Sequence, residues 1–333
     1  MATLEEVGAL AGVSRATVSR VINGSPKVSP DVRVAVQRAI TKLGYTPNLA
    51  ARSLVTRRTD TLALVVCEPE ERIFSDPFFA AVVRGLTSAA AAADKNLVLL
   101  LAQDEGERER AQRYLRPEHV DGVVLMSLHG DDPLPRHLRR AGTPTVLVGR
   151  PFGRGGIPYV DADNRGGARL AVEHLLAQGR KRVATIAGPA NMCAGVDRLD
   201  GYRDALAAGD PDVEPALVEE GDFGEESGYA AMRRLLAASP QLDAVFAASD
   251  LMAAGALRAL REAGRDVPGD VAVVGFDDVP LAAHLQPSLT TVRQPLDEMS
   301  QATADLLMHR IAHPAERVKP IVCPTALVVR ASG

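Results

Sequence analysis

Tryptophan is absent from this chain of 333 residues, cysteine occurs only three times, and no long apolar run is present. The cysteines are far apart and form no Cys-x-x-Cys pair, which favours buried thiols in a reducing compartment over a disulfide framework. No apolar stretch approaches the roughly 20 residues that cross a bilayer. The first residues also lack the basic and apolar segments of a signal peptide, so we expect a cytoplasmic protein without membrane contact.

Charge is distributed unevenly along the chain. Residues 1–58 contain nine Lys or Arg and three Asp or Glu, a net charge of +6, whereas the whole chain carries −4. The remainder therefore carries −10. A basic segment joined to an acidic body concentrates the attraction for phosphate in one place, which indicates nucleic-acid binding by the N-terminal part.

The basic segment begins with two short helical patterns over residues 4–22. Thr3 and Glu6 form the capping-box signature of a helix start. Gly12 can adopt the left-handed conformation that a tight turn between helices requires, and Ser14 can cap the second helix. The apolar positions Leu4, Val7, Leu10, Val18, Val21 and Ile22 recur at helical spacing and predict one buried face.

The second of these helices is predicted to expose a polar, cationic face. Arg15, Ala16, Ser19 and Arg20 lie opposite its apolar positions. A third helix is expected from Ser29-Pro30 to Gly44, and its apolar stripe completes a small core. This pattern is typical of a helix-turn-helix whose second helix enters the major groove of DNA.

From Thr61 onward, short apolar runs alternate with helical patterns, which is typical of parallel strands covered on both faces. The expected strands are Leu62–Val66, Leu97–Leu101, Val120–Met126, Thr145–Val148, Val183–Ile186, Ala216–Glu219, Ala244–Ala247 and Val271–Gly275. The expected helices are Phe78–Ala93, Glu107–Leu115, Leu134–Ala141, Asn164–Ala177, Asp197–Ala207, Ser227–Ala237 and Leu251–Ala263. Two such series predict an α/β body of two doubly wound lobes, with the tail from Thr290 to Val329 crossing between them.

Sequence patterns of catalysis are missing from the body. The glycines of 153–156 lack the full dinucleotide-binding spacing, and neither a phosphate-binding loop nor a Gly-x-Ser-x-Gly elbow is present. The segment 161–166 starts like a calcium loop, but Arg165 and Val172 stand where oxygen ligands are required, so we interpret it as the start of a helix. The seven histidines are scattered. We expect neither an enzyme nor a metal or cofactor site.

Three motifs carry a resemblance to a known family. Residues 16–24 read ATVSRVING, residues 43–48 read LGYTPN, and residues 51–54 read ARSL. With these motifs the chain resembles the lactose/purine/galactose repressor (LacI/GalR) family of bacterial transcriptional repressors along its whole length. The body is similar to actinobacterial regulators of cellulose-derived sugar use, in the stretches 56–61, 127–129, 148–151 and 246–252.

The resemblance implies a division into domains. Residues 1–47 would form the helix-turn-helix head, 48–60 the hinge helix and linker, and 61–333 a body of periplasmic-binding-protein type. The body's N-lobe would comprise about 61–160 and 291–320, and its C-lobe about 161–290 and 321–333. An eight-residue hinge helix cannot be stable alone, so it must fold against its dimer mate and the minor groove, or against the body.

The resemblance also implies DNA contacts. Leu54 stands where the family inserts a leucine between base pairs, and such an apolar wedge kinks the duplex. Alternatively, Leu54 only packs against the body. The full set of implied DNA-binding residues is Thr3, Leu4, Ser14, Arg15, Ala16, Thr17, Ser19, Arg20, Asn23, Lys27, Tyr45, Asn48, Ala51, Arg52 and Leu54.

A sugar effector is implied between the lobes. Because tryptophan is absent, phenylalanine or tyrosine must provide the apolar platform for a sugar ring, and an arginine can bridge two hydroxyl groups. The effector-binding positions implied by the resemblance are Phe78, Phe79, Ser127, Arg150, Arg198, Phe223, Ser249, Asp250 and Asp277.

Several of these positions have a structural alternative. Phe78 and Phe79 are adjacent on a helix, so at most one is expected to face the cleft. Asp250 could cap the helix that follows it, and Arg198 could form an ion pair with Asp277. Relatives that bind purines use the same positions, so the site by itself does not define a sugar.

The sequence thus predicts a repressor that binds palindromic operator DNA as a homodimer and responds to cellobiose or a related β-glucoside. A dimer is expected because no heptad tail follows the last strand. The alternatives are a sugar-binding transport component, or a sugar kinase joined to a DNA-binding head. The family also contains corepressor-driven members, so the direction of the response stays open.

Overall fold

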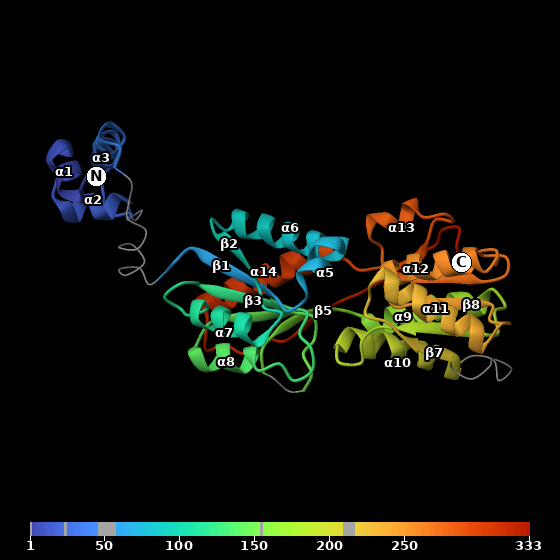
Figure 1. The fold of residues 1–333 in the computed structure, drawn as a ribbon. Coiled ribbons are helices and arrows are strands. Elements are labelled where there is room, and N and C mark those ends of the chain that lie inside the picture. Colours follow the sequence, from blue (N-terminus) through green and yellow to red (C-terminus); the bar gives the residue numbers. More distant parts are fainter. Residues whose placement is uncertain (1, 23–24, 46–57, 154–155, 209–216) are drawn as a thin grey trace. The chain divides into compact units, whose positions relative to one another are not determined.

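The computed structural model describes residues 2–22, 25–45, 58–153, 156–208 and 217–333 (Figure 1). The chain separates into two compact units, Met1–Thr59 and Asp60–Gly333. Asn23 and the predicted hinge segment 48–55, with Asn48, Ala51, Arg52 and Leu54, lie outside the described residues. Among the described residues, no helix is both long and apolar enough to cross a membrane.

The N-terminal unit contains three helices, α1 (Leu4–Ala11), α2 (Arg15–Ile22) and α3 (Pro30–Leu43). The predicted capping box is present, because Thr3 and Glu6 bond each other's backbone N–H groups, and Gly12 ends α1 at φ 69°. The Oγ of Ser14 accepts from the N–H of Thr17 at 3.2 Å. The buried core consists of Val7, Val18, Val21, Val36 and Ala39.

The second unit contains two six-stranded sheets. The first is entirely parallel, in the order β11-β5-β4-β3-β1-β2. The second has the order β12-β10-β9-β8-β6-β7, and only β12 is antiparallel. The strands of the first sheet are β1 Thr61–Val66, β2 Asn96–Leu101, β3 Gly122–Met126, β4 Thr145–Val148, β5 Tyr159–Ala162 and β11 Ile321–Cys323. Those of the second are β6 Val183–Ala187, β7 Leu217–Glu220, β8 Ala244–Ala247, β9 Ala272–Asp277, β10 Thr290–Arg293 and β12 Ala326–Val328.

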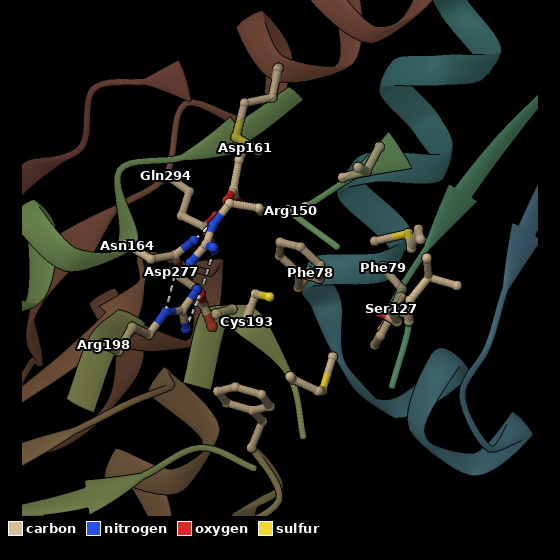
Figure 2. A pocket seen from close by; sticks show the side chains of 18 of the residues that line it. Phe78, Phe79, Ser127, Arg150, Asp161, Asn164, Cys193, Arg198, Asp277 and Gln294 are labelled. Carbon is tan, nitrogen blue, oxygen red and sulfur yellow. Dashed lines mark hydrogen bonds and ion pairs between the residues drawn. The ribbon is translucent and has the colours of Figure 1, made fainter. Parts of the chain in front are cut away.

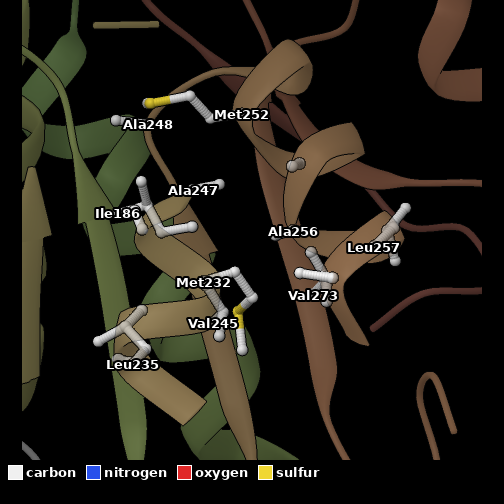
Figure 3. Packing of buried hydrophobic residues seen from close by; sticks show 14 of the residues in the cluster. Ile186, Met232, Leu235, Val245, Ala247, Ala248, Met252, Ala256, Leu257 and Val273 are labelled. Atoms are coloured by element: carbon white, nitrogen blue, oxygen red, sulfur yellow. The ribbon is translucent and has the colours of Figure 1, made fainter. Parts of the chain in front are cut away.

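Helices cover both faces of each sheet, which explains the nearly continuous apolar strands. The helices of the first lobe are α5 Glu70–Ser75, α6 Pro77–Ala92, α7 Glu105–Tyr114, α8 Leu134–Ala141 and α14 Leu296–Ala312. Those of the second are α9 Asn164–Ala177, α10 Cys193–Ala208, α11 Glu225–Ala238, α12 Asp250–Glu262 and α13 Pro280–His284. In the second lobe, α11 and α12 pack Met232, Leu235 and Met252 against β6, β8 and β9 (Figure 3), while α9 and α10 cover the other face.

The chain crosses between the sheets three times, but at later positions than the sequence predicts. The first crossing follows β5, which ends at Ala162 and not at residue 160. We predict the second crossing at residue 290, whereas β10 continues beside β9 to Arg293. The predicted assignment of 321–333 to the C-lobe is wrong at its start, because Ile321–Cys323 pairs with β5. These strands have three or four residues, too few for a clear pattern.

A stability prediction follows from the close packing of α11 and α12. A Cβ on Gly255 would lie 2.0 Å from the carbonyl oxygen of Glu225. Gly255→Ala is therefore expected to destabilise the fold by about 1–3 kcal/mol through overpacking. A Cβ on Gly106, which is exposed on α7, meets nothing closer than 3.4 Å, so Gly106→Ala should instead stabilise by about 0.5–1 kcal/mol. Urea unfolding would measure both, and equal shifts in the two variants would contradict this account.

Candidate functional site

A cavity that is partly open to solvent lies between the two lobes of the second unit. Its polar residues follow the carboxyl ends of strands, where open α/β sheets bind ligands. Ser127 follows β3, Arg150 follows β4, and Gln294 follows β10, while Asp161 and Asp277 lie within the last two residues of β5 and β9. The first sheet and the second thus both contribute to one site (Figure 2).

Arg198 of α10 is the most constrained polar group of the cavity. Its Nε donates to Asn164 Oδ1 at 2.8 Å, and one terminal nitrogen donates to the carbonyl of Ala248 at 2.6 Å and to Asp277 Oδ1 at 3.3 Å. The guanidinium also lies 3.7 Å from the ring centre of Phe276. Burial lowers the pKa of Arg198, while Asp277 and Asp161 raise it. The guanidinium is therefore held in place before any ligand arrives.

Two buried carboxyl groups face this arginine. Burial raises the pKa of Asp277 to about 6, although Arg198 opposes the shift. Burial and the charge of Asp197 raise the pKa of Asp161 to about 6 as well. Gln294 Nε2 donates to Asp277 at 2.6 Å, and Asn164 Nδ2 donates to Asp161 at 3.0 Å. Both carboxyl groups are ionised at neutral pH and can accept hydrogen bonds from ligand hydroxyl groups.

Three phenylalanine rings also line the cavity, and one of them, Phe223, lies 5.5 Å from the Arg198 guanidinium. The rings of Phe78 and Phe79 at the start of α6 meet edge to face at 5.5 Å. Phe223, from the second lobe, is 6% exposed and also lines the cavity. Arg72 of α5 lies over the rings of both Phe79 and Phe223, at 5.8 and 5.3 Å. Aromatic faces together with fixed polar groups suit a ring that has an apolar face and hydroxyl edges.

Polar contacts link the two lobes beside the cavity. Arg150 of the first lobe pairs with Asp197 of the second at 2.6 Å. His129 contacts Asn191 at 3.2 Å and, through its other ring nitrogen, Glu68 at 3.1 Å. The hydrogen bond to Glu68 raises the pKa of His129 despite partial burial. These contacts stabilise one particular arrangement of the lobes. A ligand that binds another arrangement more tightly can therefore shift the equilibrium between the two arrangements.

Backbone strain is concentrated at the same place. Ser127, Phe223 and Asp277 all line the cavity and have positive φ angles of 56°, 71° and 116°. Residues with side chains rarely adopt such angles, and strained residues are often found at functional sites. Asp277 is the last residue of β9, Ser127 directly follows β3, and Phe223 lies three residues after β7.

Seven of the nine predicted effector positions line the cavity, and both Phe78 and Phe79 are among them. Ser249 and Asp250 do not. Ser249 caps α12 and donates to the carbonyl of Phe223 at 2.8 Å. Asp250 is fully buried and accepts from Val279 N at 2.9 Å. The sequence pattern alone cannot separate these supporting roles from ligand contact.

The sequence reasoning overlooks other cavity residues, namely Arg72, Asp76, Asp161, Asn164 and Gln294. Asp161 and Gln294 stand at the ends of β5 and β10, so a polar residue at a strand end is the signal that could have identified these two. Those short strands are not predicted. The segment 161–166 is interpreted only as a helix start, and Asp163 does cap α9 by accepting from Gly166 N.

The predicted DNA-reading face is present on α2. Arg15, Ala16 and Arg20 are exposed, whereas Val18 and Val21 are buried. Arg15 is paired with Glu5 at 3.1 Å, and both side chains are more than half exposed, so the arginine can move to a base edge at little cost. Leu4 and Tyr45 pack against the core of this unit. Of the other predicted contacts, Thr3, Ser14 and Lys27 are exposed, and Thr17 and Ser19 are half-buried.

Comparisons with known proteins agree with both units. Residues 3–48 match the model for bacterial regulatory proteins of the lacI family, and residues 172–333 match a periplasmic binding protein-like domain. The HTH-type transcriptional regulator CelR of Thermobifida fusca is 53% identical over 99% of this chain and 98% of its own length. The ribose operon repressor of Escherichia coli K12 is 34% identical over 100% of both chains.

Two solved structures are similar over nearly the whole chain. A complex of the transcriptional regulator CelR with cellobiose is 51% identical and covers 100% of both chains, with a TM-score of 0.80. A lac repressor dimer bound to operator and the anti-inducer ONPF is 27% identical, covers 99% of this chain and 98% of its own, and has a TM-score of 0.86. The chain belongs to the lacI family, whose members are bacterial transcriptional regulators.

Proposed function

We propose that this protein is a transcriptional repressor whose affinity for a palindromic operator is controlled by cellobiose or a related β-glucoside. The observation that carries the proposal is the cavity between the lobes, which Arg198, two carboxyl groups and three phenylalanine rings line together. The whole-length similarity to a regulator solved with cellobiose supports this class of ligand. The same similarity supports a cytoplasmic, non-enzymatic role.

The proposed control connects the cavity to the hinge segment. An eight-residue helix over 48–55, which lie outside the described residues, would be too short to be stable alone, and we propose that a second copy and the minor groove support it. In this proposal, a sugar changes contacts between the lobes, such as the ion pair of Arg150 with Asp197. The change in the body then alters the support that the hinge segment receives. We propose induction, in which sugar lowers operator affinity. Linkage then requires that operator lowers sugar affinity by the same factor, typically about 5–150-fold.

A sugar screen tests the function directly. Cellobiose, cellotriose, glucose and ribose are compared by thermal shift and then by calorimetry, since a ligand at 100 times its Kd stabilises by about 2.7 kcal/mol. A gel shift with a palindromic operator measures release by each sugar, and an ATP-turnover assay tests the sugar-kinase alternative. Binding of cellobiose without any effect on a bound operator would instead support a transport component.

The pH dependence of sugar affinity provides a further prediction. The pKa values of Asp161 and Asp277 are both raised to about 6 by burial, so these groups lose their charge as the pH falls through that value. If one charged carboxylate is required, affinity should be about fourfold weaker at pH 5.5 than at pH 7.5. Calorimetry at the two pH values checks this. Asp161→Asn and Asp277→Asn should flatten the dependence, and an unchanged profile in both would contradict the assignment.

We predict that the protein forms a homodimer. A helix-turn-helix that binds a palindrome needs two copies related by a two-fold axis. Light scattering of the full chain at micromolar concentration should therefore give twice the chain mass of 35.2 kDa. A monomer or a stable tetramer under these conditions would overturn the proposed assembly.

A further inference from the structure

Three potential metal ligands meet at the end of α14, far from the motifs that indicate function. His309 lies in the last turn of this helix, His313 is its C-cap four residues later, and Glu316 lies in the turn that follows. One donor atom from each residue lies within 4.8 Å of the others. The scattered histidines of the sequence predict no such site, because His313 and Glu316 lie beyond the recognisable helix pattern.

The ring of His313 contacts the backbone of α14. Nδ1 of His313 contacts the carbonyl oxygen of His309 at 3.3 Å. A carbonyl oxygen can only accept, so Nδ1 carries the proton and Nε2 keeps a free lone pair. A hydrogen bond from the second ring nitrogen to a backbone carbonyl is the usual way in which proteins orient histidine ligands.

The Nε2 atom of His309 is a second candidate ligand atom. It is buried, and within the described part of the chain it is one of only four buried side-chain nitrogen or oxygen atoms without a hydrogen-bond partner. Nε2 faces Glu316 Oε2 at 3.2 Å, in a geometry that is not a hydrogen bond. A buried lone pair directed at a carboxylate is unfavourable unless a proton or a cation lies between them.

The backbone holds Glu316 beside the histidines. Its N–H donates to the carbonyl of His313 at 3.1 Å, and Arg310 donates to the carbonyl of Glu316 at 2.5 Å. Donor atoms of one tetrahedral zinc ion lie about 3.4 Å apart, given Zn–N bonds of about 2.0–2.1 Å. His309 and Glu316 already satisfy this spacing, and a rotation of the exposed His313 side chain would complete it.

We propose that His309, His313 and Glu316 form a site for a divalent transition-metal ion of the Zn²⁺ type, with water as the fourth ligand. Two imidazoles and one carboxylate match the preference of these ions over Mg²⁺ or Ca²⁺. The ion would fasten the end of α14 to residues 313–320, which lead into β11. At this end α14 packs on Gly122, the first residue of β3, so the site lies away from the sugar cavity.

Calorimetric titration with ZnCl₂ tests the proposal on the full chain after tag removal and EDTA treatment. We expect one ion per chain, and at least about tenfold weaker binding for His313→Ala and for Glu316→Gln. His313 and Glu316 are exposed, so both variants should fold, and circular dichroism checks this. His137→Ala, which removes an exposed histidine from α8, serves as the matched control and should bind zinc like the parent.

Trypsin cleavage provides a second readout, which does not depend on the heat of binding that calorimetry measures. The bond between Arg317 and Val318 lies in the segment that the ion would fasten, and Arg317 is exposed. Zinc should slow cleavage at this bond in the parent and in His137→Ala, but not in His313→Ala. Absence of zinc binding by the parent, or equal affinity in the parent and His313→Ala, would overturn the site.

Discussion

Arg198→Ala is expected to abolish the response of operator binding to cellobiose, while the sugar-free variant still binds its operator. Arg198 organises the cavity, because it bonds Asn164, Ala248 and Asp277 at once. Its loss removes both the proposed hydroxyl contact and the fixed position of Asp277. Gel shifts across a range of cellobiose concentrations measure the effect, and we expect no release where the parent is released completely.

The same substitution has a structural cost that needs its own control. Removing one partner of a buried ion pair leaves the other unpaired, at a cost of about 3–5 kcal/mol. The double variant Arg198→Ala/Asp277→Asn avoids the unpaired carboxylate and should fold better without recovering the response. Arg203→Ala, an arginine of the same helix that is 57% exposed, should respond like the parent. A normal response in folded Arg198→Ala would show that the sugar binds elsewhere.

Arg15→Ala is expected to change which operator the protein prefers. An arginine on the exposed face of α2 can form two hydrogen bonds to one guanine, and losing such a contact costs about 1–3 kcal/mol. That corresponds to roughly 5–150-fold weaker binding to the operator. Competition gel shifts with operator and random DNA measure the two affinities separately, and the loss should fall almost entirely on the operator.

Arg58→Ala is the matched control for this prediction. Arg58 lies in the basic segment but outside the helix-turn-helix. A phosphate contact contributes equally on every sequence, so its loss should weaken operator and random DNA alike and reduce the salt dependence of binding. If Arg15→Ala also weakens both DNAs equally, Arg15 contacts phosphate and does not choose bases.

Elements with strong local signals could be predicted from the sequence. The capping box at Thr3, the left-handed turn at Gly12 and the strand at Thr145–Val148 all agree with the structure. In these places local backbone preference and burial favour the same conformation. The family resemblance then assigned Arg198 and Phe223 to the cavity, where the structure also places them.

Features that depend on distant pairing could not be predicted. The three residues of β11 are mostly exposed and become a strand only because β5 offers a free edge. For the same reason Asp161 and Gln294 are not recognised as cavity residues. Ser249 and Asp250 carry the polar pattern of a ligand site, but tertiary contacts with Phe223 and Val279 direct them into the fold. Local sequence does not encode such partners.

The order in which the chain leaves the ribosome differs from the order in which its lobes can be completed. The first sheet lies largely within residues 61–162, yet its cover α14 and its edge strand β11 are synthesised only at 296–323. The second sheet lacks only β12 once residue 293 has emerged. Nascent chains must therefore leave one apolar face of the earlier lobe covered by α6 alone while the later lobe assembles. During synthesis, the lobe made first is thus the one exposed to aggregation for longest.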